Sequence, residues 1–157
     1  MQKITSCLWF NNQAEEAANF YTSIFKNSKV SDISRYTEGS PGQAGTAMTV
    51  AFQLDGQEFM ALNGGPEFAF TEAISFCVNC ETQSEVDEFW EKLSEGGEES
   101  QCGWLKDKYG VSWQIVPTAL GQLMSGGDPN KSKRVMDALL KMRKLDINVL
   151  RQAYEQG

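Results

Sequence analysis

The chain has 157 residues, 41% of them hydrophobic, which suits one ordinary domain or two small repeats sharing a core. Its 14 Lys and Arg residues against 21 Asp and Glu residues give a net charge of −7. This balance argues against nucleic acid or an anionic membrane as the main partner, because both need clustered positive charge. No stretch approaches the ~18 apolar residues of a membrane span, and the N-terminus lacks a signal-like pattern, so we expect a cytoplasmic protein.

The first half of the chain has the pattern of a strand, a helix and further strands. Leu8 and Phe10 alternate with Cys7 and Trp9, which is typical of a strand with two different faces. Between residues 17 and 25, apolar residues recur at i, i+3, i+4, i+7 and i+8, which predicts an amphipathic helix. Two strand-like runs, residues 47–54 and 58–62, flank the hairpin signal Asp55-Gly56. The Gly- and Ser-rich residues 35–45 predict a mobile loop.

The second half repeats this order. Leu8 aligns with Phe76 at an offset of 68, and in the helices Phe20 aligns with Phe89 at an offset of 69. Strand-like runs at residues 103–106 and 111–116 complete the repeat. Each half is therefore predicted to be a βαβββ unit whose helix covers one face of its sheet. The open faces of two such units could line a cup.

Residues 118–157 have no counterpart in the first half. Asp128-Pro129 is a helix-start signature, and Leu145-Asp146 predicts the start of a short final helix. We expect one domain of residues 1–117, made of repeats 1–66 and 70–117, followed by a helical tail of residues 118–157. Residues 131–144 are enriched in Lys and Arg, which favours the solvated side of a helix; the alternative is an interaction surface.

The four cysteines are Cys7, Cys77, Cys80 and Cys102. Cys77 and Cys80 form a CxxC pattern, but within a strand a separation of three residues places two side chains on opposite faces. With this spacing the two thiols cannot share a metal ion or form a redox pair. A zinc site would also need a second pair of ligands, and the sequence has neither a second CxxC nor a histidine. We therefore expect reduced, partly buried thiols.

The βαβββ repeat resembles the vicinal oxygen chelate superfamily, which includes glyoxalase I and the extradiol dioxygenases, and is most similar to its PhnB-like branch. The segments that carry the resemblance are Leu8–Phe10 with residues 14–21, residues 61–66, residues 102–117 and residues 135–147. The resemblance implies an α+β fold in which paired βαβββ repeats form a cupped, mostly antiparallel sheet with helices outside. It also implies a homodimer, because superfamily members commonly pair by exchanging strands or helices.

The superfamily implies a metal in the cup, held from four strand positions by His, Glu or Gln. Carried over by the shared strand pattern, these positions fall on Thr5, Met60, Ala73 and Gln114. Only Gln114 could serve as a ligand, and a neutral amide is a weak one for Zn, Ni or Fe. The chain contains no histidine at all. We therefore expect no metal and no other cofactor.

Side-chain alternation gives a set of candidate ligand-binding residues for the cup. This set combines hydroxyl, sulfur, amide and aromatic groups, which suits an apolar or aromatic ligand held by a few polar contacts. Its members are Thr5, Cys7, Trp9, Asn63, Ser75, Trp104 and Gln114. The alternative is that these residues fill a collapsed core.

The resulting hypothesis is a metal-free protein that binds a small molecule in the sheet cup. Alternatives are an enzyme of lyase, isomerase or transferase type acting on an unknown substrate, and an interaction protein that uses the basic tail helix. Relatives in the PhnB-like branch often carry a demethylubiquinone methyltransferase label. The sequence gives no support for that activity, because no glycine-rich strand-to-helix nucleotide loop with a downstream acidic residue is present.

Overall fold

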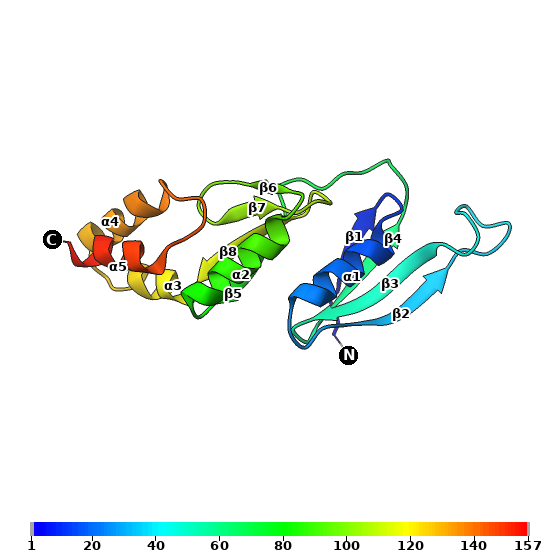
Figure 1. Cartoon of the computed structure of the whole chain (residues 1–157), viewed down its shortest axis with the longest axis horizontal. Coiled ribbons are helices and arrows are strands. Elements are labelled where there is room, and N and C mark those ends of the chain that lie inside the picture. The colour runs from blue at the N-terminus through cyan, green and yellow to red at the C-terminus, as the bar shows by residue number, and fades with distance from the viewer. Residues whose placement is uncertain (1, 157) are drawn as a thin grey trace. The chain divides into compact units, whose positions relative to one another are not determined.

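In the computed structural model, which describes residues 2–156, the chain forms two compact units, Met1–Phe70 and Thr71–Gly157. The first unit contains β1 (Ser6–Phe10), α1 (Ala14–Ile24), β2 (Lys29–Arg35), β3 (Ala47–Leu54) and β4 (Gln57–Asn63) (Figure 1). Its strands form one sheet in the order β1-β4-β3-β2. β1 runs parallel to β4, and the other neighbouring pairs are antiparallel.

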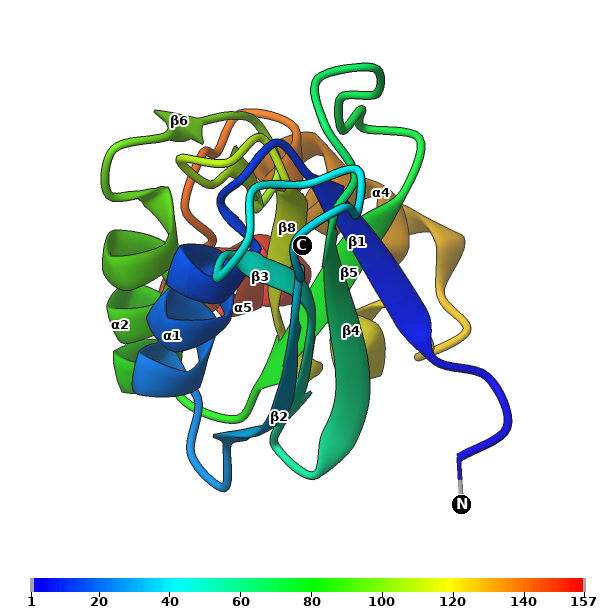
Figure 2. The same cartoon turned by 90° about the vertical axis from the view of Figure 1, so that its right-hand side faces the viewer.

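Helix α1 covers one face of this sheet (Figure 2). Its small residues Ala14, Ala17 and Ala18 are fully buried, so the helix can lie close to the strands. Tyr21 stacks on Phe52 of β3 at 6.3 Å between ring centroids. The β3–β4 hairpin turns through Asp55 and Gly56, whose φ angles of 49° and 81° are both positive, as a tight two-residue turn requires. The hairpin predicted from Asp55-Gly56 is confirmed.

The second unit repeats this arrangement with shorter strands. It contains β5 (Ser75–Cys80), α2 (Gln83–Ser94), β6 (Glu98–Glu99), β7 (Trp104–Lys106) and β8 (Ser112–Pro117), in the sheet order β5-β8-β7-β6. β5 runs parallel to β8, as β1 does to β4. Thr82 caps the N-terminus of helix α2, because its side chain accepts a hydrogen bond from the Glu85 N–H. Its buried face consists of Val86, Trp90 and Leu93.

The turn between β7 and β8 is built around the carboxylate of Asp107, which is only 3% exposed. Oδ1 accepts hydrogen bonds from the backbone N–H groups of Tyr109 at 2.9 Å and Val111 at 3.0 Å. Oδ2 accepts one from the indole Nε1 of Trp113 at 2.9 Å. The carboxylate therefore ties the turn to the buried face of β8.

Three further helices follow the second sheet: α3 (Thr118–Met124), α4 (Pro129–Leu139) and α5 (Ile147–Glu155). Gln83 of α2 donates to the Leu145 carbonyl at 3.0 Å and accepts from the Ile147 N–H at 2.8 Å. The N–H groups of Cys102 and Gly103 donate to the carbonyls of residues 142 and 143, each at 2.8 Å. The tail therefore packs on the second repeat, and the predicted helix starts at Asp128-Pro129 and Leu145-Asp146 are confirmed.

Three basic residues of the tail are paired within the chain. Arg134 donates to the carbonyls of Ala153 and Tyr154, both at 3.0 Å, at the C-terminal end of α5. Two lysines form ion pairs, Lys133 with Asp137 at 2.8 Å and Lys144 with Asp87 at 2.9 Å. These contacts stabilise the tail and leave less positive charge for a partner.

Among the described residues, no helix is long and apolar enough to cross a membrane.

The α+β fold of paired βαβββ repeats with outer helices is confirmed, as two mixed four-stranded sheets. The predicted strand offset of 68 is wrong by two residues. Met60 and Gln114 are equivalent, since each lies four residues after the glycine of its hairpin (Gly56 and Gly110). Met60 pairs with Cys7 and Gln114 pairs with Cys77, so equivalent positions in β1 and β5 differ by 70. An error of two residues in the offset leaves each residue on the same face of its strand, because side chains alternate with a period of two. The faces predicted from alternation are therefore unaffected by this error. The boundary between a domain of residues 1–117 and a tail stays a prediction.

Candidate functional site

Each sheet has one face covered by its helix and an opposite, open face. In the second sheet, the helix side is marked by the buried residues Leu105, Trp113 and Ile115. Alternation then assigns the open face to the residues between them. These are Ser75 and Cys77 of β5, Ser112 and Gln114 of β8, and Trp104 and Lys106 of β7.

The ladder arranges these six residues in two rows across the open face. The first row is Cys77, Gln114 and Trp104, and the second is Ser75, Ser112 and Lys106. Directly opposite side chains on one face lie about 5 Å apart at Cβ, so each row is contiguous. The rows are linked by a hydrogen bond from Gln114 Nε2 to Ser75 Oγ at 3.0 Å. The open face thus presents amide, hydroxyl, ammonium and indole groups side by side.

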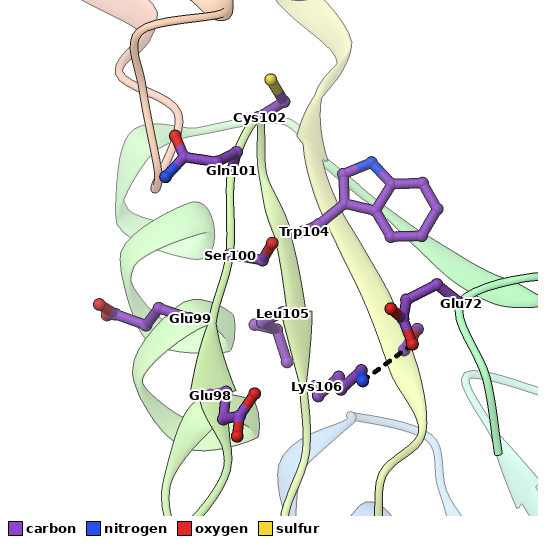
Figure 3. Close-up of a pocket in the computed structure, with 10 residues that line it drawn as sticks. Glu72, Glu98, Glu99, Ser100, Gln101, Cys102, Trp104, Leu105 and Lys106 are labelled. Carbon is purple, nitrogen blue, oxygen red and sulfur yellow. Dashed lines mark ion pairs between the residues drawn. The ribbon is translucent and has the colours of Figure 1, made fainter.

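A cavity of about 500 Å³ lies at the β7 side of this face. It is lined by residues of β6 and β7, by the turn between them, by Ser112 and by Glu72 from the segment before β5. Figure 3 shows Lys106 and Glu72 pointing toward one another, with the Trp104 ring beside them. A volume of this size is in the range that holds small organic ligands.

The charges of the cavity centre on Lys106. Its Nζ forms an ion pair with Glu72 Oε1 at 2.8 Å. Hydrogen bonding to Lys106 and the charge of Lys106 lower the pKa of Glu72, and hydrogen bonding to Glu72 raises the pKa of Lys106, with a smaller contribution from the charge of Glu98. Glu99 is engaged elsewhere, because it accepts from the Trp90 indole at 2.6 Å and lies 3.9 Å from Arg143. Lys106 is therefore charged and is paired with an exposed carboxylate.

Ser112 is the buried polar residue of this site. The residue is 1% exposed, and its Oγ has no hydrogen-bond partner among the described residues. It lines the cavity and lies opposite Lys106 in the ladder. A buried hydroxyl without a partner is uncommon and needs an explanation.

The open face of the first sheet has a different character. Cys7 and Trp9 of β1 lie opposite Met60 and Leu62 of β4. The Trp9 indole donates to the Gly65 carbonyl at 2.9 Å, and its ring meets Phe68 edge-on at 5.0 Å. A side chain at position 64 would collide with the Trp9 ring, so Gly64 allows this segment to lie over the indole. This face is mainly apolar, and its tryptophan is already partnered.

The predicted ligand-binding residues are distributed over both units. Ser75, Trp104 and Gln114 share the open face of the second sheet, whereas Cys7 and Trp9 share that of the first. The position predicted for Asn63 is wrong, since it lies on the helix side of β4 and is 8% exposed. Its Oδ1 accepts from the Ala14 N–H and its Nδ2 donates to the Ala47 carbonyl, both at 2.9 Å. The Asn63 side chain is thus used to hold the start of α1 against β3.

Thr5 and Ala73 lie just before β1 and β5 and are exposed. With the observed offset of 70, the counterpart of Thr5 in the second repeat is Ser75, and not Ala73. The four equivalent positions are therefore Thr5, Met60, Ser75 and Gln114.

These four positions do not fit the metal that the fold implies. They supply two hydroxyls, a thioether and an amide, whereas catalytic Zn, Ni or Fe sites use imidazole, thiolate or carboxylate ligands. No group of three or more His, Cys, Asp or Glu residues suited to a metal ion occurs within residues 2–156. The side chains at these four positions therefore do not match the metal site that the superfamily implies.

The cysteines follow the predicted alternation. Cys77 is exposed on the open face, Cys80 is buried on the helix side, and both are free thiols. Burial raises the pKa of Cys80 to about 12, with a further contribution from the charge of Glu85. This thiol is unreactive at neutral pH, because only the thiolate is nucleophilic.

Comparison with known proteins identifies the family of the chain. The sequence model of the family described as 3-demethylubiquinone-9 3-methyltransferase matches residues 2–116. The chain belongs to this PhnB-like family of the vicinal oxygen chelate superfamily. The match ends before α3, so it does not reach residues 135–147, for which the resemblance stays a prediction. Comparison with curated proteins found no match.

Solved structures agree with this assignment. A PhnB protein from Bacillus cereus is 45% identical, with a TM-score of 0.70 over 74% of this chain and 99% of that one. Protein PA1353 from Pseudomonas aeruginosa is 20% identical, with a TM-score of 0.62 over 74% and 98% of the two chains. The fosfomycin resistance protein FosX from Listeria monocytogenes, solved with Mn(II) and a dihydroxypropylphosphonic acid, is 16% identical, with a TM-score of 0.55 over 74% and 92%. The last two matches show the fold alone.

Sequence reasoning missed Glu72, Lys106 and Ser112. Two of them were within reach of the alternation argument, because Lys106 lies two residues from Trp104 and Ser112 two residues from Gln114. Glu72 gave no such signal, since it lies in a connecting segment before β5.

Proposed function

We propose that the protein binds a small organic molecule, without a metal ion, on the open face of the second sheet. Membership of the PhnB-like family supports a role in small-molecule binding or catalysis. The observation that carries the proposal is the Ser112 hydroxyl, which has no partner within residues 2–156 and lines a cavity of about 500 Å³ together with Lys106 and Trp104. A buried polar group, a cation and an aromatic ring converging on one cavity are the features of a ligand site.

A thermal-shift screen of small aromatic and carbonyl compounds against the purified protein tests this proposal. We expect hits whose stabilisation is lost in Trp104→Ala and Gln114→Ala, because both side chains belong to the same row of the open face. Asn148→Ala is the matched control, since Asn148 is an exposed amide of helix α5 that lies on neither face of the sheet and does not line the cavity. Hits that survive both site variants would place the ligand elsewhere and refute the proposal.

We also propose that the protein forms a homodimer. Ile4 and Ile74, which are equivalent at the offset of 70, are 88% and 74% exposed, as large apolar side chains at an interface between subunits would be in one isolated chain. Light scattering after gel filtration measures the mass directly. Ile4→Glu and Ile74→Glu should shift a dimer toward monomer, whereas a monomeric wild-type protein contradicts the proposal.

A further inference from the structure

We propose that Lys106 and Ser112 form a subsite for one carboxylate group of the ligand, and that the Glu72 carboxylate occupies the Lys106 side of this subsite until a ligand displaces it. This inference rests on the proposed function and specifies its ligand class: a small monocarboxylic acid with an apolar or aromatic body. The elements of the subsite come from adjacent strands of one sheet and from the segment before β5 (Figure 3).

The two anion-binding groups lie next to each other. Lys106 and Ser112 are directly opposite in the antiparallel β7–β8 ladder and point to the same face. Lys106 brings a positive charge with three donors, and the Ser112 hydroxyl adds a further donor without a protein partner. An oxygen acceptor placed between them would satisfy both groups, which explains a hydroxyl that the described residues leave unsatisfied.

Glu72 shows that a carboxylate fits against Lys106. Its Oε1 lies 2.8 Å from the Lys106 Nζ, a good distance for a charge-assisted hydrogen bond. The pair is nevertheless easy to exchange, because the side chains of Lys106 and Glu72 are 36% and 61% exposed and Glu72 belongs to no strand. Exposed ion pairs of this kind are weak. A ligand carboxylate that also reaches Ser112 would bond both groups of the subsite, whereas Glu72 bonds only Lys106 of the two.

The surrounding charges favour one negative charge over two. Glu98 lies close enough for its charge to raise the pKa of Lys106, so a second carboxylate already acts on the only cation that lines the cavity among the described residues. A phosphate dianion gains about twice the attraction of a monoanion to Lys106, but the free energy of removing it from water rises about four-fold, with the square of its charge, so a single lysine favours a monoanion. Trp104, in the adjacent row, supplies a flat apolar surface for the body of the ligand.

Titration of isotope-labelled protein with benzoate, its neutral analogue benzamide and inorganic phosphate, followed by NMR at the Trp104 indole N–H, tests the subsite. We expect benzoate to bind more tightly than benzamide or phosphate. Glu72→Gln removes the competing carboxylate and should tighten benzoate binding about two- to five-fold, as expected from the strength of an exposed ion pair. Lys106→Met should make benzoate no better than benzamide.

Two further variants make the outcome specific. Ser112→Ala should weaken benzoate binding without lowering the melting temperature, since the deleted hydroxyl makes no hydrogen bond to the described residues. Lys108→Met is the matched control, because Lys108 is an exposed lysine of the same hairpin that does not line the cavity. Its benzoate affinity should equal that of the wild type.

The results separate the subsite from the proposed function. Equal binding of benzoate and benzamide at Trp104, unchanged by Glu72→Gln, would overturn the carboxylate subsite while leaving a binding face. An effect of Lys108→Met as large as that of Lys106→Met would overturn it too, because general charge would then explain the preference. No shift of the Trp104 signal with any of the probes, in the wild type or in Glu72→Gln, would count against both proposals.

Discussion

The carboxylate of Asp107 provides a sharp test of how the second sheet is held together. It accepts two backbone N–H bonds and the Trp113 indole bond, at 2.9–3.0 Å, while being 3% exposed. The turn that it organises joins Lys106 to Ser112, so the candidate site depends on it. The informative perturbation is Asp107→Asn, which keeps the size of the side chain and removes its charge.

The expected cost follows from counting these bonds. Hydrogen bonds to a charged group contribute about 1.5–3 kcal/mol and neutral ones about 0.5–1.5, so two backbone bonds lose about 1 kcal/mol each. The new amide nitrogen faces the Trp113 indole N–H, and a buried donor without an acceptor costs about 1–3 kcal/mol. The sum is roughly 3–5 kcal/mol, which corresponds to a fall in melting temperature on the order of 10 °C for a chain of this size.

Urea denaturation followed by tryptophan fluorescence measures this cost. Asp55→Asn, an exposed substitution in the corresponding hairpin of the first sheet, is the matched control and should change stability by less than about 0.5 kcal/mol. In a double-mutant cycle, Trp113→Phe should cost less in the Asp107→Asn background, because it removes the unsatisfied donor. Additive effects, or a cost of Asp107→Asn below about 1 kcal/mol, would refute this reasoning.

Three other predictions follow from buried groups. Asn63→Ala leaves two buried backbone groups without partners, so chemical denaturation should show a loss of about 2–5 kcal/mol. Leu145→Ala, at a fully buried position of the tail, should cost about 2–5 kcal/mol, and an unchanged melting temperature would show that the tail is not docked. The folded protein keeps the Cys80 proton up to about pH 12, whereas an unfolded thiol loses it near 8.5. Stability should therefore decline as pH rises from about 9, less steeply in Cys80→Ala; equal slopes would contradict this.

Features with a local cause could be predicted from the sequence. The Asp55-Gly56 hairpin could be predicted because only a few residue types tolerate two positive φ angles in succession. The tail helices were readable because Asp128 and Asp146 accept hydrogen bonds from backbone N–H groups in the first turns of α4 and α5. The faces of β1 and β5 followed from alternation, which survives a register error of two residues.

Features that depend on pairing between distant residues could not be predicted. Asn63 lies at the end of a strand-like pattern, and no neighbouring residue indicates that its side chain forms hydrogen bonds with the backbone of Ala14 and Ala47. β6 has only two residues, both glutamates, so it carries no hydrophobic pattern. The meeting of Glu72 with Lys106 joins residues 34 positions apart, and only the completed sheet brings them together.

Because the tail packs on the second repeat, the two repeats can complete their folding at different times during synthesis. All residues of the first unit have been made once the ribosome has added Phe70. The second unit lacks part of its core until Leu145 and Leu150, both fully buried, have emerged from the exit tunnel. Domains fold as units as the chain emerges from the ribosome. The first repeat can therefore reach its native state before helix α5 of the second unit has emerged. The two βαβββ repeats would thus complete their folding at different times, and the repeat that folds later contains the candidate site.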